Sequence, residues 1–173
     1  MMDIDEYIDY IVAQMCIGNS DNGNAKFFRY EGGKWTWILF DTDLAFHNVA
    51  YPSLVEHLNP AGTGVVDGTS TNLINALMRN SEFKDKFLTR MAWQLNNIWT
   101  EENILARIEE LDALIAEDLV KDYARWGYDY EGREKFVESL RIFARGRRDT
   151  MINYTKNYFN LTEDQMRSYG FYS

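Results

Sequence analysis

Residues 19–43, "NSDNGNAKFFRYEGGKWTWILFDTD", contain the pattern on which the fold prediction depends. A polar loop rich in Asn, Asp and Gly is followed by two aromatic runs that flank Glu31-Gly32-Gly33. Glycine supplies the positive φ angles of a tight turn, so the pattern predicts a β-hairpin. The second run ends in Asp41 and Asp43, one residue apart. Because side chains alternate along an extended strand, both carboxylates should point the same way.

The composition indicates one compact, acidic domain. A chain of 173 residues can bury a sizeable core, so we predict a single domain over residues 1–173. The net charge of −9 argues against nucleic acid or an anionic membrane as a partner, and fits a protein that gathers a divalent cation. Cys16 is the only cysteine, which excludes an internal disulfide and a cysteine zinc cluster. The chain has no apolar run of the roughly 18 residues that a membrane span needs.

The rest of the sequence is helical in pattern. Asp3 can cap a first helix, whose apolar residues recur with a 3.6-residue period up to the loop at residues 18–24. Residues 47–71 hold both prolines and several glycines, and are predicted to form one long loop. Further helices are predicted around residues 73–78, 81–98, 100–119, 131–144 and 149–159. The predicted fold class is therefore mainly α with a small β-hairpin (α+β).

The acidic pair alone allows a phosphatase function. "ILFDTDLA" resembles the opening motif of haloacid-dehalogenase-type phosphatases, in which Asp41 would be the nucleophile and Asp43 the acid/base. That family has a small turn after the second Asp, where this chain has Leu44-Ala45. It also needs later parallel strands, and no alternation of strands and helices follows residue 46. This function is the less favoured alternative.

The loop before the hairpin favours a phosphotransferase instead. Reading onward from this loop gives Asp21, Asn24, a hairpin and then the pair at Asp41 and Asp43. This is the order of the catalytic segment in kinase-fold enzymes. Transfer of a phosphoryl group requires hard oxygen ligands that converge on Mg²⁺, and a hairpin would place Asp21 and Asp41 side by side.

This segment and the sequence around it resemble the spore-coat protein H (CotH) family of atypical kinases, which are secreted or spore-associated. The similar stretches are "DIDEYIDYIVAQMCIGNSDNGNAKFFRYEGGKWTWILFDTDLAF" at residues 3–46, "LINALMRNSEFKDKFLTRMAWQLN" at 73–96 and "LRIFARGRRDTM" at 140–151. The resemblance covers nearly the whole chain. It implies the C-terminal-lobe part of a protein-kinase-like fold.

The resemblance also implies roles for individual residues. Asp21 would be the catalytic-loop Asp, and Asn24 and Asp41 would bind Mg²⁺ together with ATP. Asp43 would be a second metal ligand or an anchor for the first. Asn22 competes with Asn24 for its role, and either Asp of the pair could face the metal.

The family's activity would be Mg²⁺-dependent transfer of the γ-phosphoryl group of ATP to a protein hydroxyl. A kinase also needs an N-terminal lobe with a glycine-rich lid, a strand Lys and its Glu partner. The chain begins at the helix that leads to the catalytic loop, so we expect this fragment to be inactive unless it is joined to that lobe. The alternative is a helical interaction or scaffold domain without activity.

The resemblance further implies a bacterial protein that is extracellular or associated with the spore coat. Its partner would be a protein substrate or a coat or cell-surface protein, and the oligomeric state stays open. Among other residues, Arg145, Arg147 and Arg148 are interpreted as a solvated helix end, with phosphate or acidic-peptide binding as the alternative. Trp35 and Trp37 are predicted to pack in the core.

Overall fold

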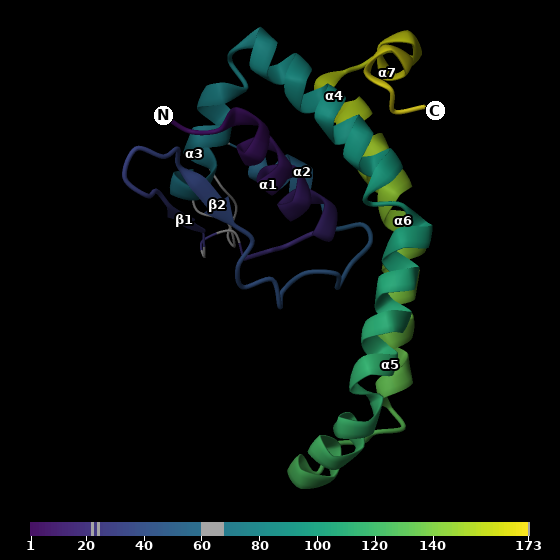
Figure 1. The fold of residues 1–173 in the computed structure, drawn as a ribbon. Helices are drawn as coiled ribbons and strands as arrows, with labels where there is room; N and C mark the ends of the chain where they lie inside the picture. The colour runs from purple at the N-terminus through teal and green to yellow at the C-terminus, as the bar shows by residue number, and fades with distance from the viewer. Residues whose placement is uncertain (22, 24, 60–67, 173) are drawn as a thin grey trace.

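The computed structural model describes residues 1–21, 23, 25–59 and 68–172, which form a helical body with one long two-helix arm (Figure 1). The elements are α1 (Ile4–Ile17), β1 (Lys26–Phe28), β2 (Thr36–Ile38), α2 (Ser53–His57), α3 (Gly68–Leu77), α4 (Ser81–Asn97), α5 (Glu101–Trp126), α6 (Arg133–Phe159) and α7 (Glu163–Tyr169). The prediction of a mainly α fold with a small β-hairpin is therefore confirmed. None of the described helices is long and apolar enough to cross a membrane.

The hairpin forms as predicted. Strands β1 and β2 pair antiparallel, with Phe27 opposite Trp37, and Gly32 takes a φ of 75° in the turn between them. The described residues contain no other sheet, so the parallel strands that a haloacid-dehalogenase-type phosphatase requires are not found among them. Trp37 packs edge-on against Tyr7 of α1, with ring centroids 4.8 Å apart. Trp35 remains 38% exposed, so the prediction of core packing is right only for Trp37.

Helix α1 lies inside the body and contacts α2, α4, α6 and β2. The Asp3 carboxylate caps its first turn by accepting from the backbone N–H of Asp5, as the sequence predicts. The apolar side of α1 is buried together with residues of α4 and α6. Fully buried members of this core include Ile8, Val12, Met15, Phe87, Leu88, Met91 and Met151.

The prediction of one loop over residues 47–71 is wrong in two places. Helix α2 occupies Ser53–His57, and α3 already begins at Gly68, while residues 60–67 lie outside the described part. Pro52 stands at the N-cap of α2, where a fixed φ and a missing N–H cost little. Leu54 and Leu58 then enter the core, and this burial stabilises a helix too short to show a period.

The two helices predicted at residues 131–144 and 149–159 are a single helix, α6. Gly146 lies in its middle and has a packing role, because a Cβ at this position would lie 2.8 Å from Val49 Cγ2. The absent side chain lets α6 approach the segment that follows the hairpin.

Helices α5 and α6 run side by side, and their outer halves extend beyond the body as the arm (Figure 1). Ion pairs join them: Arg133 contacts Asp112, and Arg141 Nε donates to Glu109 at 2.7 Å. No residue of α5 is buried, although apolar residues recur along it. The arm therefore leaves one apolar face of α5 uncovered.

Burial predicts how two phenylalanines contribute to stability. Phe87 is fully buried in the core and Phe136 is 72% exposed on the arm. We expect Phe87→Ala to lower the free energy of unfolding by about 3–5 kcal/mol, because it removes buried apolar surface and leaves a cavity. Phe136→Ala should change it by no more than about 0.5 kcal/mol. Urea denaturation followed by circular dichroism measures both, and equal losses would contradict the assignment of the core.

Candidate functional site

The loop that carries Asp21 begins where α1 ends. Gly18 ends the helix with a φ of 66°, and its N–H donates to the Met15 carbonyl at 3.2 Å. Asn19 is fully buried. Its Oδ1 accepts from the backbone N–H of Asp21 at 3.0 Å, and its Nδ2 donates to Gln14 Oε1 at 2.9 Å. Asn19 therefore ties the backbone of Asp21 to the last turn of α1.

The segment that carries the acidic pair is bonded to this same loop. The N–H of Phe46 donates to the Ile17 carbonyl at 2.9 Å, and the N–H and hydroxyl of Ser20 both lie 3.4 Å from the Leu44 carbonyl. These contacts join residues more than 20 positions apart in the chain. They bring the Asp21 loop next to the turn that follows β2.

The pKa of Asp41 reflects the charges of the acids around it. The pKa of the Asp41 carboxyl is raised above its usual range, first by a hydrogen bond shared with the Asp43 side chain and then by partial desolvation. The negative charges of Asp43 and Asp21 raise it further, while Lys26 lowers it. The structure thus brings Asp21, Asp41 and Asp43 into one acidic cluster.

The backbone of Asp41 is also unusual. Its φ of 53° lies in the left-handed region, which non-glycine residues seldom adopt and which Asp tolerates better than most. Phe46 has a φ of 61°. Two such residues within six positions make the chain turn sharply on either side of Asp43. This turn keeps the acidic pair close to the Asp21 loop.

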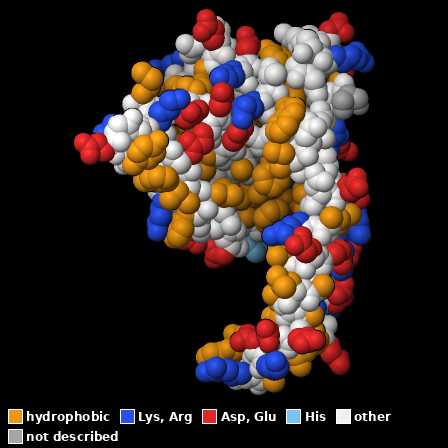
Figure 2. Space-filling model, in the orientation of Figure 1, with side chains coloured by type: hydrophobic (Ala, Val, Ile, Leu, Met, Phe, Trp, Pro, Cys, Tyr) orange, Lys and Arg blue, Asp and Glu red, His pale blue; other side chains and the backbone are white. Residues whose placement is uncertain are grey.

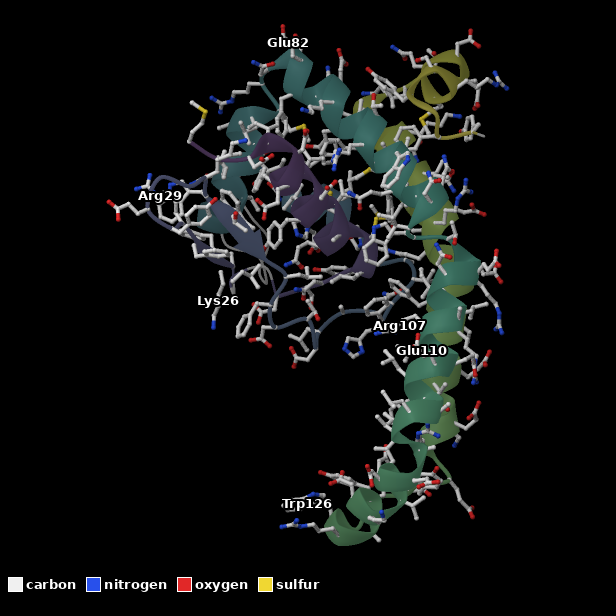
Figure 3. All side chains as sticks on the ribbon, in the orientation of Figure 1. Lys26, Arg29, Glu82, Arg107, Glu110 and Trp126 are labelled. Atoms are coloured by element: carbon white, nitrogen blue, oxygen red, sulfur yellow. The ribbon has the colours of Figure 1, made fainter. Side chains whose placement is uncertain are left out.

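Asn24 and its competitor Asn22 lie outside the described residues. The role of Asn24 as a metal and nucleotide ligand therefore stays a prediction. Lys26, the first residue of β1, has its Nζ 3.5 Å from the ring centroid of Phe40, the residue before Asp41. Figure 3 shows Lys26 and Arg29 projecting from the hairpin, on the side of the body away from Arg107 and Glu110 of the arm.

The acidic cluster has the donor chemistry of a magnesium site. Mg²⁺ takes oxygen ligands, keeps several waters and commonly uses only one or two carboxylates. A divalent cation would also relieve the repulsion that raises the pKa of Asp41. Among the described side chains, however, no group of three His, Cys, Asp or Glu residues could hold a metal ion. The carboxylates of Asp41 and Asp43 fit Mg²⁺ by their chemistry, and the metal site itself stays a prediction.

Asn19 and Lys26 were given no role in the sequence analysis, and Arg147 was given a different one. The interpretation of Arg145, Arg147 and Arg148 as a solvated helix end holds for Arg145, whose Nη1 donates to Glu138 at 2.8 Å. It is wrong for Arg147, which is 2% exposed. Arg147 points from α6 into the body because carbonyl groups of two other segments meet there and need donors.

The two histidines have different surroundings. His47 donates from Nε2 to the Asp43 carbonyl at 3.0 Å and so supports the turn that holds the acidic pair. His57 is buried at the end of α2, with Nδ1 2.7 Å from the Ser53 carbonyl. Burial lowers the pKa of His57 from 6.5 to about 4.

An apolar hollow lies in the corner between the arm and the body. Its volume is about 480 Å³, and its lining includes Ile104, Ile108, Leu111 and Val137 together with Phe46. Figure 2 shows apolar side chains gathered in this corner. Phe46 is the link to the acidic cluster, because it follows Asp43 by three residues and packs on Phe143 of α6, with ring centroids 5.1 Å apart.

Comparison with protein-family models matches residues 1–151 to the family described as CotH kinase protein. The chain belongs to the CotH kinase family. The match includes Asp21, Asp41 and Asp43 and ends within α6. No curated protein and no solved structure matches the chain. For this CotH-family chain, the resemblance noted in the sequence is thereby confirmed at the level of the family.

The buried histidine predicts a pH dependence of stability. Between pH 6.5 and about 4, unfolded chains bind a proton at His57 that the folded chain excludes. The unfolded state then holds more protons, so stability is full above pH 6.5 and falls as the pH drops toward 4, by about 3 kcal/mol for this group. Urea denaturation across this range should show the loss in the wild type.

A His57→Gln variant provides the control. Glutamine keeps a polar side chain but does not titrate in this range, so the variant should lose less stability between pH 6.5 and 4 than the wild type. If the two chains lose the same amount, His57 is not the group responsible.

Proposed function

We propose that this chain is the part of a CotH-type kinase that carries the acceptor-binding and metal-binding acids. In the intact protein it supports Mg²⁺-dependent transfer of the γ-phosphoryl group of ATP to a protein hydroxyl. One observation carries the proposal: Asp21, Asp41 and Asp43 come together through backbone bonds between two distant segments. All three lie within the residues that match the family.

Each acid has a distinct role in this proposal. Asp21, on a backbone fixed by Asn19, orients the acceptor hydroxyl and takes its proton as the oxygen bonds to the γ-phosphorus and ADP leaves. Asp41 and Asp43 would hold Mg²⁺, together with Asn24 as predicted from the sequence. The metal would supply positive charge to the β- and γ-phosphates.

The contact between the two acids supports this division of roles. A hydrogen bond with the Asp43 side chain raises the pKa of Asp41. A divalent cation bound by the pair would favour the deprotonated carboxylates, because metal ligands must be deprotonated.

The kinase-like fold is part of the proposal. The described hairpin and helices supply the acids, whereas a glycine-rich lid, a strand Lys and its Glu partner belong to an N-terminal lobe in kinases. We propose that the intact protein provides these groups outside residues 1–173. Its acceptor would be a protein of the cell surface or spore coat, as the family resemblance implies.

The metal site predicts the effect of one substitution. Asp41→Asn removes a charge from the cluster, so the affinity for Mn²⁺, used as a probe for Mg²⁺, should fall by about 10- to 100-fold. Isothermal titration calorimetry on the 173-residue chain measures this affinity. In the full-length protein, the same variant should lose incorporation of label from [γ-³²P]ATP.

The matched control is Asp118→Asn on the arm, which removes an exposed carboxylate that pairs only with Lys121 among its described ionic contacts. This variant should bind Mn²⁺ like the wild type. A wild-type chain with no affinity for Mn²⁺, or equal labelling of the wild type and Asp41→Asn, would contradict the proposed function.

A second candidate, the helical interaction domain, is favoured by the uncovered face of α5. Leu114 is 74% exposed and Ile115 is 46% exposed. If two copies met about a two-fold axis, the uncovered apolar face of α5 in each would be buried against the other copy. The occupant that this arrangement favours is a second copy of the chain.

Self-association tests this candidate. A Leu114→Glu variant places a charge on the apolar face and should shift a wild-type dimer to a monomer in sedimentation velocity. Tyr30→Glu changes an equally exposed residue on the hairpin turn and should leave the dimer intact. A wild-type chain that sediments as a monomer at its highest soluble concentration contradicts the candidate.

A further inference from the structure

Arg147 of α6 is a buried cation surrounded by carbonyl oxygens. It is 2% exposed, and desolvation lowers its pKa. Its guanidinium donates five hydrogen bonds of 2.6 to 2.9 Å to Met15 O, Cys16 O, Val49 O, Tyr51 O and Ser53 Oγ. The planar fork of arginine can serve acceptors on several sides at once.

These acceptors belong to the two segments that form the candidate site. Met15 and Cys16 are in the last turn of α1, directly before the Asp21 loop. Val49 and Tyr51 lie in the segment that continues from Asp43 toward α2. A cation at the C-terminal end of α1 is favourable, because the free carbonyls of a helix end carry partial negative charge.

The geometry leaves little freedom around this group. Gly18 ends α1 directly beneath it, where an added Cβ would lie 3.3 Å from Arg147 Nη2. The Arg147 guanidinium also lies over the ring of Phe143, 5.3 Å from its centroid, and Phe143 in turn contacts Phe46. The N–H of Phe46 donates to the Ile17 carbonyl. The guanidinium, the Phe143 ring and this backbone bond therefore hold together the end of α1 and the segment after Asp43, a contact called the junction below.

We infer that Arg147 is a positioning residue, which sets the separation between the Asp21 loop and the segment that carries Asp41 and Asp43. This inference rests on the proposed function. Arg147 touches none of the three acids in its hydrogen bonds, and acts by fixing the backbone on both sides of them. A lysine at this position would keep the charge, but its single ammonium group could not bridge both segments.

The test is Arg147→Lys in the 173-residue chain, with Arg145→Lys as the matched control. Arg145 is an exposed residue two positions away on α6 and pairs with Glu138. Amide hydrogen exchange reports the junction directly, since the N–H groups of Asp21 and Phe46 make its bonds. Exchange at these two amides should accelerate about tenfold or more in Arg147→Lys, with the α4 amides still protected.

Mn²⁺ affinity provides the second measurement. We expect Arg147→Lys to weaken Mn²⁺ binding by about tenfold, while Arg145→Lys binds like the wild type. If the role of Arg147 were purely structural, Arg147→Lys would lower the free energy of global unfolding. The folded variant would still bind Mn²⁺ with the affinity of the wild type. Unchanged exchange at Asp21 and Phe46, together with unchanged Mn²⁺ affinity, would overturn the inference.

Two further outcomes of these experiments also test the role of Arg147. If Arg147→Lys does not fold, Ser53→Ala removes one acceptor of the guanidinium and should accelerate the same two amides to a smaller extent; no acceleration there overturns the inference. If the wild type does not bind Mn²⁺, the proposed function fails, while the exchange of Asp21 and Phe46 still decides whether Arg147 positions them.

Discussion

The structure depends on how the buried C-terminal end of α1 satisfies its last carbonyl groups. Within the core these oxygens have no water to bond, and an unpaired one would be costly. The backbone N–H groups of Asn19 and Gly18 donate to the carbonyls of Gln14 and Met15. The Arg147 guanidinium donates to the carbonyls of Met15 and Cys16. The N–H of Phe46 donates to the carbonyl of Ile17. The donors come from the loop, from α6 and from the segment after the hairpin. Capping one helix therefore fixes the loop that follows it and two distant parts of the chain.

The acidic cluster is the electrostatic result of that arrangement. Asp21 and Asp41 belong to segments that would repel each other in isolation, and the bonds at the end of α1 hold them together. The hydrogen bond with Asp43 is the main cause of the raised pKa of Asp41, and the negative charge of Asp21 raises that pKa further. Carboxylates that are held close together favour binding of a cation, because the cation reduces the repulsion between their charges. In the proposed function, the acids would use such an affinity to hold Mg²⁺ for phosphoryl transfer.

Much of this arrangement could be predicted from local sequence, and the rest depends on tertiary contacts. The hairpin was predictable because Gly32 and alternating aromatic residues are local signals, and it leads directly to Asp41. Helix α2 was missed because five residues are too few to show a helical period. The continuity of α6 past Gly146 was missed, since the contact of this glycine with a distant segment is not visible in the neighbouring residues. Arg147 resembled a surface arginine for the same reason: its acceptors lie about 100 and 130 positions away.

The continuity of α6 has a mechanical consequence. The helix has 27 residues and therefore a length of about 40 Å, over which an α-helix is stiff. Its first half lies in the arm beside α5, and its second half crosses the body (Figure 1). Arg147 and Gly146 sit at the point where the helix passes the junction of the acidic segments. A continuous α6 therefore couples the orientation of the arm to the position of that junction.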